Sequence, residues 1–323
     1  MANIIETVLL LALPASGKSE VRNYLKHLPH DECEKDFHMG PTVQLDDFPY
    51  VHVMRRIDDE LAKMGEDRIF FAAPDKPFKN PVDWGTLVAL VNEDYGDLVA
   101  KKQFKPASAA ALMLERIEKA ALSVGAPQRL SLLKAGTKEK LEQVLEKEAA
   151  GMLAEKLANY TDTLKGKTLV IEFARGGPDG SPMPLKPPFG YAHSVGLLAP
   201  RILEKARILY VWVTPEESRR KNNERSNPND PGSILHHGVP LDVMLNDYGC
   251  DDMDWLERNS GRPGTIAVVC RGKKLNIPLA RFDNRVDKTS FLRADKKDWP
   301  ADKVKAVHEG LKGALEKLAA YKG

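Results

Sequence analysis

The 323-residue sequence has only three cysteines, Cys33, Cys250 and Cys270, and they lie far apart. No two of them form a C-x-x-C pair, so we expect neither a disulfide framework nor a zinc site. Sparse, unpaired cysteines are typical of a reducing compartment, and we therefore expect a cytoplasmic protein. The adjacent His236 and His237 have no metal-ligand pattern around them, and we assign them no metal.

The chain also lacks an excess of charge of either sign. Its 48 Lys and Arg side chains and 46 Asp and Glu side chains give a formal net charge of only +2. No strong global field therefore attracts nucleic acid or a membrane, although a local basic site is not excluded. The N-terminal apolar run, residues 5–12, is too short to span a bilayer and lacks a positive leader. We interpret it as a buried strand.

Five short apolar runs are predicted strands. Nearly continuous β-branched and aliphatic residues are typical of strands that are buried on both faces of a parallel sheet. Because helical stretches lie between the runs, we expect crossover connections and an α/β fold. The runs are residues 5–12, 42–45, 168–173, 208–213 and 265–270.

The segment between the second and third predicted strands is too long for a simple crossover. Two parts of it, residues 107–124 and 138–165, have the composition and spacing of helices. We therefore expect a mostly helical insertion over residues 53–165. It is either a cap on the substrate side of the sheet or an appendage that only stabilises the fold.

The most informative segment directly follows the first predicted strand. It reads Ala12-Leu13-Pro14-Ala15-Ser16-Gly17-Lys18-Ser19 and precedes a helical stretch at residues 20–27. A strand, a loop and a helix in this order direct backbone N–H groups toward an anion. The spacing matches the phosphate-loop (Walker A) pattern, with Ala12 in place of the usual glycine; alanine suits that turn if its φ is not positive. The alternative is a surface turn with a solvated lysine.

This pattern predicts ATP and Mg²⁺ as cofactors. Lys18 would reach the β- and γ-phosphates, and the Ser19 hydroxyl would bind Mg²⁺. A turn after the fifth predicted strand contains Asn284, which is a candidate for the adenine edge, although Asp-Asn is also ordinary turn chemistry. The candidate cofactor-binding residues are Pro14, Ala15, Ser16, Gly17, Lys18, Ser19 and Asn284.

Carboxylates end two of the predicted strands. Asp46 and Asp47 follow the second strand, and Glu172 lies near the end of the third. The carboxyl ends of parallel strands share the edge of the sheet that carries the phosphate loop, so these groups are expected near the γ-phosphate. Asp46 would activate an acceptor hydroxyl, and Glu172 and Asp47 are candidate Mg²⁺ ligands, directly or through water. The alternatives are a helix N-cap for the aspartates and a structural pair between Glu172 and Arg175.

Arginines would supply the positive charge that phosphoryl transfer requires. Arg175 is expected at the mouth of the cleft, where its guanidinium can contact phosphate or carboxylate with two hydrogen bonds. Arg219, Arg220 and Arg225 lie on a predicted helix that leads into a loop rich in Pro, Asn and Gly. Residues 214–240 would thus form a closing lid that carries cations to the transition state. A solvated basic helix face is the alternative.

These segments together resemble the P-loop kinases of small molecules and nucleotides. Leu13 to Ser19 is similar to the phosphate loops of that group. Asp46-Asp47-Phe48 is similar to the Asp-x-Phe segment of uridine kinase and phosphoribulokinase relatives, in which the first Asp is the base toward the acceptor hydroxyl. Glu172 to Arg175 resembles the third-strand segment of adenylate kinase-like enzymes, and the Arg219–Arg225 region resembles their lid.

The resemblance covers residues 1–52 and 166–323 and implies a core of five parallel strands in the order 2-3-1-4-5. It implies an ATP- and Mg²⁺-dependent phosphotransferase whose partners are a nucleoside triphosphate and a small-molecule or nucleoside-like acceptor. We expect no association with a membrane. One alternative is a kinase of a polynucleotide end or a nucleotide sugar, similar to the zeta-type toxins. Another is a nucleotide-binding regulatory protein or NTPase without a small acceptor.

Overall fold

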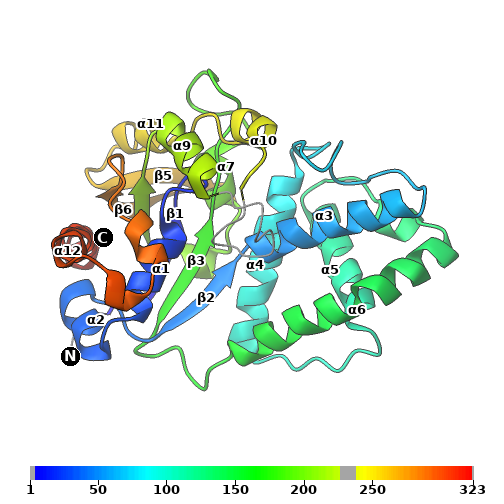
Figure 1. Ribbon diagram of the computed structural model, residues 1–323, viewed down its shortest axis with the longest axis horizontal. Coiled ribbons are helices and arrows are strands. Elements are labelled where there is room, and N and C mark those ends of the chain that lie inside the picture. The colour runs from blue at the N-terminus through cyan, green and yellow to red at the C-terminus, as the bar shows by residue number, and fades with distance from the viewer. Residues whose placement is uncertain (1–3, 226–237, 322–323) are drawn as a thin grey trace. The chain divides into compact units, whose positions relative to one another are not determined.

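The computed structural model describes residues 4–225 and 238–321 (Figure 1). The chain divides into two compact units, which we call the sheet unit and the helical unit. The predicted lid falls partly on residues 226–237, and that part lies outside the described residues, as do His236 and His237. The sheet unit comprises residues 1–43, 163–196 and 200–323, and the helical unit comprises residues 44–162 and 197–199.

The described residues contain one six-stranded sheet, in the order β2-β3-β1-β4-β6-β5. The central strand β1 pairs in parallel with β3 and β4, and β4 pairs in parallel with β6. The edge strand β5 is antiparallel to β6. The predicted α/β class is therefore confirmed. The strands are β1 (Thr7–Leu11), β2 (Thr42–Asp46), β3 (Thr168–Phe173), β4 (Ala206–Trp212), β5 (Thr265–Cys270) and β6 (Lys273–Asp283).

The predicted order 2-3-1-4-5 of five parallel strands is wrong at one edge of the sheet. Residues 265–270 do form a strand, but β6 lies between it and β4, and its direction is antiparallel. Strand β6 was not predicted because it begins with two exposed lysines and contains Pro278, which argues against a strand interior. Arg271 and Gly272, both at positive φ, form the tight turn of the β5–β6 hairpin.

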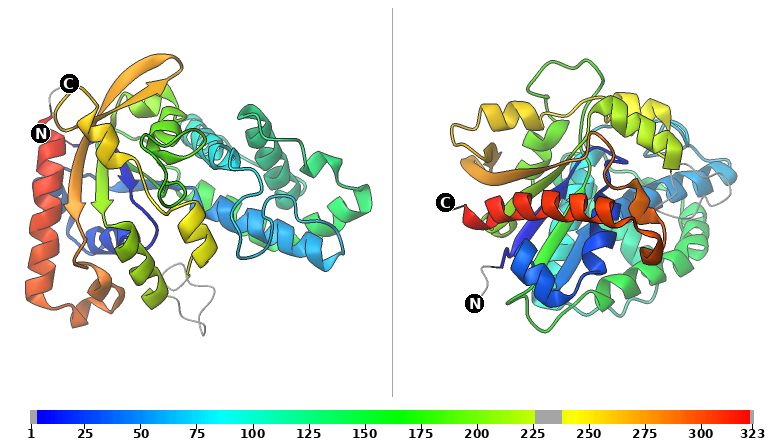
Figure 2. Two further views of the ribbon diagram at one scale, coloured as in Figure 1. Left: turned by 90° about the horizontal axis from the view of Figure 1, so that it is seen from above. Right: turned by 60° about the vertical axis from the view of Figure 1, so that its left-hand side comes forward.

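The sheet is covered by helices, which explains why every residue of β1 is buried. One core cluster joins β1 to α1, α2 and α12, and it includes Leu10, Tyr24 and Leu315. Figure 2 shows α12, in red, along the outside of this unit. The helices of the sheet unit are α1 (Lys18–Lys26), α2 (His30–Phe37), α7 (Gly190–Gly196), α8 (Pro200–Leu203), α9 (Pro215–Arg225), α10 (Leu241–Asn246), α11 (Met253–Arg258), η2 (Ser290–Arg293), η3 (Lys296–Asp298) and α12 (Ala301–Ala320).

The helical unit confirms the predicted helical character of the long segment after β2. Buried charges hold its parts together: Asp83 accepts two hydrogen bonds from the Arg129 guanidinium, and Asp58 accepts backbone N–H groups from the segment after α3. No helix in the described ranges is both long and apolar enough to cross a membrane. The elements of this unit are α3 (Phe48–Lys63), α4 (Asp83–Ala100), α5 (Ala109–Ser123), η1 (Leu130–Leu132) and α6 (Ala135–Ala158).

Candidate functional site

The loop between β1 and α1 has the predicted strand–loop–helix form. Ala15 and Gly17 have positive φ angles of 54° and 105°, and Ser16 between them is not among the residues with positive φ. Left-handed residues in such an alternation are typical of loops whose backbone N–H groups bind an anion. Ala12 is not among the residues with positive φ, so alanine is suitable there. Gly17 is the N-cap of α1 and offers no side-chain cap, which leaves the helix N-terminus suited to an anion.

The side chains of the loop have the polarity that such a site requires. Lys18 is buried, and its Nζ lies 3.4 Å from the carbonyl oxygen of Ala12 and 3.5 Å from that of Leu13. These contacts are longer than the charge-assisted bond that an ammonium makes to a phosphate oxygen. The Ser16 hydroxyl is buried and has no hydrogen-bond partner among the described residues. A buried group of this kind costs about 1–3 kcal/mol unless a ligand or water satisfies it.

The turn that follows β6, Asn284 to Ser290, contacts the phosphate loop; we call this turn the brace. The side-chain amide of Asn284 donates to the Ser16 carbonyl (2.7 Å) and to Thr289 Oγ1 (2.8 Å), and its oxygen accepts the Lys288 N–H. A Cβ on Gly17 would overlap Thr289 Oγ1 and lie 2.8 Å from Asn284 Nδ2, so only glycine fits there. Asn284 is fully buried with its polar atoms engaged inside the protein, which differs from the predicted contact to adenine.

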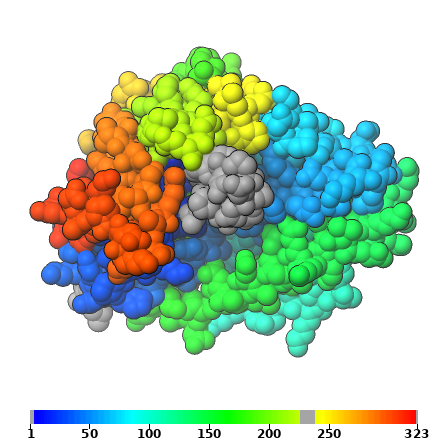
Figure 3. All heavy atoms as spheres, in the orientation of Figure 1, coloured from blue at the N-terminus to red at the C-terminus, as the bar shows by residue number. Residues whose placement is uncertain are grey.

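Helix α9 is attached to both the loop and the brace. Ser218 donates to the Pro14 carbonyl at 2.7 Å, and the fully buried Lys221 pairs with Asp287 at 2.7 Å. Burial alone would raise the pKa of Asp287, but hydrogen bonding and the charge of Lys221 lower this pKa to about 2. The surfaces of α9 and of the chain after β6 are both on the face shown in Figure 3. The described part of the predicted lid is thus anchored on the loop.

The three arginines predicted on this helix have different surroundings. Arg219 Nη2 lies 3.5 Å from Glu216, while its Nη1 is buried without a hydrogen-bond partner among the described residues. Arg220 is exposed and pairs with Glu217 and Glu224. It therefore occupies the solvated helix face that was the alternative interpretation. The helix ends at Arg225, whose side chain lies outside the described part of the chain.

The end of β3 differs in detail from the prediction. Glu172 is buried and pairs with Arg22 of α1 at 3.0 Å, so Arg22 supplies the cation that this carboxylate requires. Arg175 is also buried, instead of lying at the mouth of a cleft; its Nη1 donates to its neighbouring Ala174 carbonyl, and its guanidinium lies over a phenylalanine ring.

Arg22 and His193 are two residues near these groups that the sequence analysis missed. Arg22 has a detectable signal, since it is a cation in the helix that follows the phosphate loop. His193 has none, because it lies on the short helix α7, outside the predicted helices and strands. Burial, and to a lesser extent the charge of Arg175, lower the pKa of the His193 imidazole, which favours its neutral form.

Asp46 and Asp47 belong to the helical unit. The Asp46 carboxylate accepts the backbone N–H of Phe48 at 2.9 Å, and Asp47 stands at the N-cap position of α3 without a side-chain capping bond. Asp47 therefore occupies the N-cap position that the alternative interpretation predicted, but its carboxylate does not cap the helix. Their roles toward phosphate, Mg²⁺ or an acceptor remain predictions.

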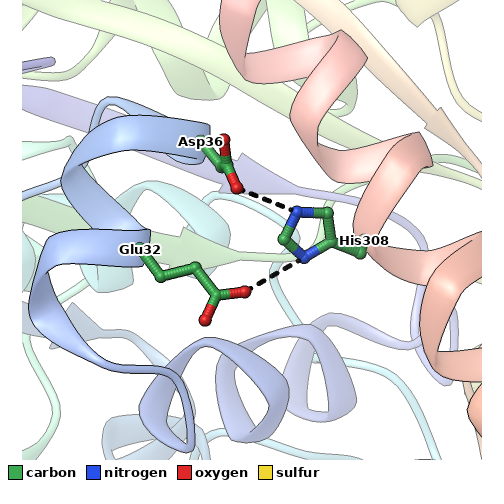
Figure 4. A group of neighbouring side chains, drawn as sticks. All are labelled: Glu32, Asp36 and His308. Atoms are coloured by element: carbon green, nitrogen blue, oxygen red, sulfur yellow. Dashed lines mark hydrogen bonds and ion pairs between the residues drawn. The ribbon is translucent and has the colours of Figure 1, made fainter.

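A second polar group joins α2 to α12. One ligand atom each from Glu32, Asp36 and His308 lies within 4.8 Å of the others (Figure 4). However, His308 Nδ1 bonds to the Tyr24 hydroxyl at 2.8 Å, His308 Nε2 lies 3.3 Å from Asp36, and Lys312 pairs with Asp36 and lowers its pKa. Both ring nitrogens of His308 and the Asp36 carboxylate thus already have partners within the protein. We therefore interpret the group as a network of hydrogen bonds and ion pairs that holds α2 and α12 together.

No protein-family model, curated protein or solved structure matches this chain. The functional interpretation therefore depends on the geometry of the sheet unit. In this unit a buried parallel strand leads into a loop that has two residues with positive φ and a buried lysine. The loop ends at the uncapped N-terminus of a helix.

Proposed function

We propose that the protein is a phosphotransferase of the P-loop kinase type that uses ATP and Mg²⁺. It would move the γ-phosphoryl group to a hydroxyl or phosphate of a small-molecule or nucleoside-like acceptor. The observation that supports this proposal is the loop from Ala12 to Ser19, which combines positive φ at Ala15 and Gly17 with a buried ammonium and an unsatisfied buried hydroxyl. A bound triphosphate would accept a hydrogen bond from the Ser16 hydroxyl, and its charge is complementary to the Lys18 ammonium and to the backbone N–H groups of the loop.

Phosphoryl transfer depends mainly on positioning and on electrostatic stabilisation, because little covalent chemistry is left to the protein. The amides of residues 15–19 would hold the β-phosphate, and Lys18 would neutralise charge on the β- and γ-phosphates. Arg219 has a buried N–H group that an anionic transition state would satisfy. Asp46 would accept the proton of the acceptor hydroxyl as the new P–O bond forms.

The loop residues also fit Mg²⁺. Ser19 lies in the first turn of α1, half-buried, directly after the lysine that would reach the phosphates. When bound, Mg²⁺ would neutralise phosphate charge and favour departure of ADP. Glu172 carries negative charge near the end of the neighbouring strand β3 and pairs with Arg22, and it would serve Mg²⁺ through a water molecule.

The experiment that tests the proposal is replacement of Lys18 by alanine in the full chain. We expect Lys18→Ala to lower turnover by at least roughly a hundredfold, because a charge-assisted contact to the transferred group is lost. Lys26→Ala is the matched control: it removes an exposed lysine from the last turn of the same helix and should retain activity. Circular dichroism checks the fold of both variants. A folded Lys18→Ala protein with wild-type turnover would contradict the proposal.

The acceptor is identified in the same assay. ADP release is measured with Mg-ATP and a panel of nucleosides, sugars, organic acids and oligonucleotides with 5′-hydroxyl ends. We expect at least one small acceptor to stimulate ADP release. Stimulation by oligonucleotides alone, with a steep dependence on salt, would assign the protein instead to kinases of polynucleotide ends.

A further inference from the structure

Asn284 contacts one particular peptide group of the phosphate loop. Its side-chain amide donates to the carbonyl oxygen of Ser16, and this carbonyl shares a peptide unit with the N–H of Gly17. In a trans peptide the C=O and N–H bonds point in opposite directions. A bond that holds the Ser16 carbonyl on the side of Asn284 therefore directs the Gly17 N–H to the other side.

This peptide unit would rotate easily without such a contact. Gly17 has no Cβ, so both orientations of the preceding peptide are sterically open to it. In the rotated form, the Ser16 carbonyl oxygen would face the anion in place of an N–H group. Since an oxygen dipole repels a phosphate, one orientation of this peptide favours binding and the other opposes it.

The brace is itself held firmly. Thr289 Oγ1 accepts from Asn284 and lies 3.4 Å from Lys221 Nζ, and Asp287 accepts the hydroxyl and backbone N–H of Ser290. Asn284, Thr289 and Lys221 are all fully buried. Asn284 and Ser16 are 268 positions apart in the sequence, so this contact forms only in the folded sheet unit.

We propose that Asn284, supported by Thr289, is a positioning residue that keeps the Ser16–Gly17 peptide in its anion-binding orientation. This inference rests on the proposed function and adds a residue that does not touch the ligand. Loss of Asn284 would leave the fold of the sheet unit in place and release the peptide. The affinity for a triphosphate would then fall, because part of the binding energy is used to reorient the loop.

The main variant is Asn284→Ala, and Asn276→Ala is its matched control. Asn276 lies on the same strand that leads to the brace, and its amide likewise donates to a carbonyl (Ser260) and to a threonine hydroxyl (Thr265), both at 3.1 Å. Deuterium exchange of the residue 15–19 amides is measured on the ligand-free full chain. We expect faster exchange in Asn284→Ala and unchanged exchange in Asn276→Ala.

Binding is measured by calorimetry with sodium tripolyphosphate and with Mg-ATP. We expect Asn284→Ala to weaken both by about tenfold, the loss expected for one hydrogen bond of this kind. Asn284→Asp should weaken them further, because a carboxylate oxygen would then oppose the Ser16 carbonyl. Thr289→Val should weaken binding, whereas Thr289→Ser, which keeps the hydroxyl, should restore it.

Kinetics separate positioning from a loss of folded protein. A positioning role raises the KM for ATP and changes kcat little, because the Gly17 N–H binds phosphate in both the ground state and the transition state. A smaller folded fraction lowers the apparent kcat and leaves KM unchanged. Wild-type exchange and affinity in folded Asn284→Ala would overturn the inference. If the wild type binds neither ligand, the proposed function fails, while the exchange comparison still decides the role of Asn284.

Discussion

The helical unit and the phosphate loop both contain buried charge, but they treat it differently. In the helical unit, Asp94 accepts hydrogen bonds from Tyr50, Arg116 and Lys156, each at 2.6 Å. Burial and the neighbouring Asp94 raise the pKa of Tyr50 well above its usual value, so its hydroxyl stays a donor. The charges of this cluster are thus paired with one another.

The phosphate loop, by contrast, contains groups that the protein leaves unsatisfied. The Ser16 hydroxyl and one nitrogen of Arg219 are buried without hydrogen-bond partners among the described residues. Ala15 also keeps a left-handed backbone that costs a non-glycine residue free energy. Since buried polar groups are normally paired, these unsatisfied groups favour a ligand at the loop.

The largest effect on stability should come from breaking the Asp94 cluster. Asp94→Ala leaves two partly buried cations, Arg116 and Lys156, with fewer partners and should lower the free energy of unfolding by about 3 kcal/mol. Asp162→Ala, which removes an exposed partner of Lys101 in the same unit, should change it by less than about 1 kcal/mol. Urea unfolding measures both.

The same variant also tests the comparison through binding. Folded Asp94→Ala should retain wild-type affinity for sodium tripolyphosphate if the cluster serves only to hold the helical unit together. A selective loss of that affinity in folded protein would show that the cluster takes part in binding, and the contrast between the two regions would no longer hold.

Gly17→Ala should have the next largest effect, and it acts on the loop. The added Cβ would overlap Thr289 Oγ1 at a backbone φ of 105°, so the loop must change shape, at a cost of about 1–3 kcal/mol. We expect affinity for Mg-ATP to fall by at least tenfold, as measured by calorimetry. Gly65→Ala is the control for φ alone, because Gly65 has φ of 77° and no atom within 4 Å of an added Cβ. Equal affinity in both variants would contradict the role given to the tight contact.

The local part of this architecture could be predicted from the sequence. The apolar run before the loop, the Gly-Lys-Ser triplet and the helical stretch after it are neighbours in the chain, so their pattern determines strand, loop and helix. The same holds for the predicted helix that carries Arg219 and Arg220: α9 begins at Pro215, and Thr214 accepts the N–H of Glu217. The helices of the helical unit that have regular apolar spacing could likewise be predicted from their local sequence.

The contacts that shape the site could not be predicted, because they join distant segments. Nothing in the residues around Asn284 indicates that its amide reaches Ser16, and an Asp-Asn pair reads as an ordinary turn. The choice of Arg22 as the partner of Glu172 likewise depends on how α1 packs beside β3. Strand β6 was missed since it begins with Lys273 and Lys274 and is interrupted by Pro278, so its membership of the sheet depends on pairing with β4 and β5.

The smallest expected effect concerns pH and the attachment of α9 to the brace. The pKa of Asp287 is about 2 in the folded protein, below its ordinary value of 3.8, so ionisation of Asp287 stabilises the fold. This contribution is fully present above about pH 4 and is lost as the pH falls toward 2, and after allowance for solvent screening it amounts to about 1 kcal/mol. Asp287→Asn removes it, so its unfolding free energy should decline less steeply than that of the wild type between pH 4 and 2. Parallel declines in urea titrations across this range would mean that the Lys221–Asp287 pair does not fasten α9 to the brace, and the loop would then have one support fewer than the structure indicates.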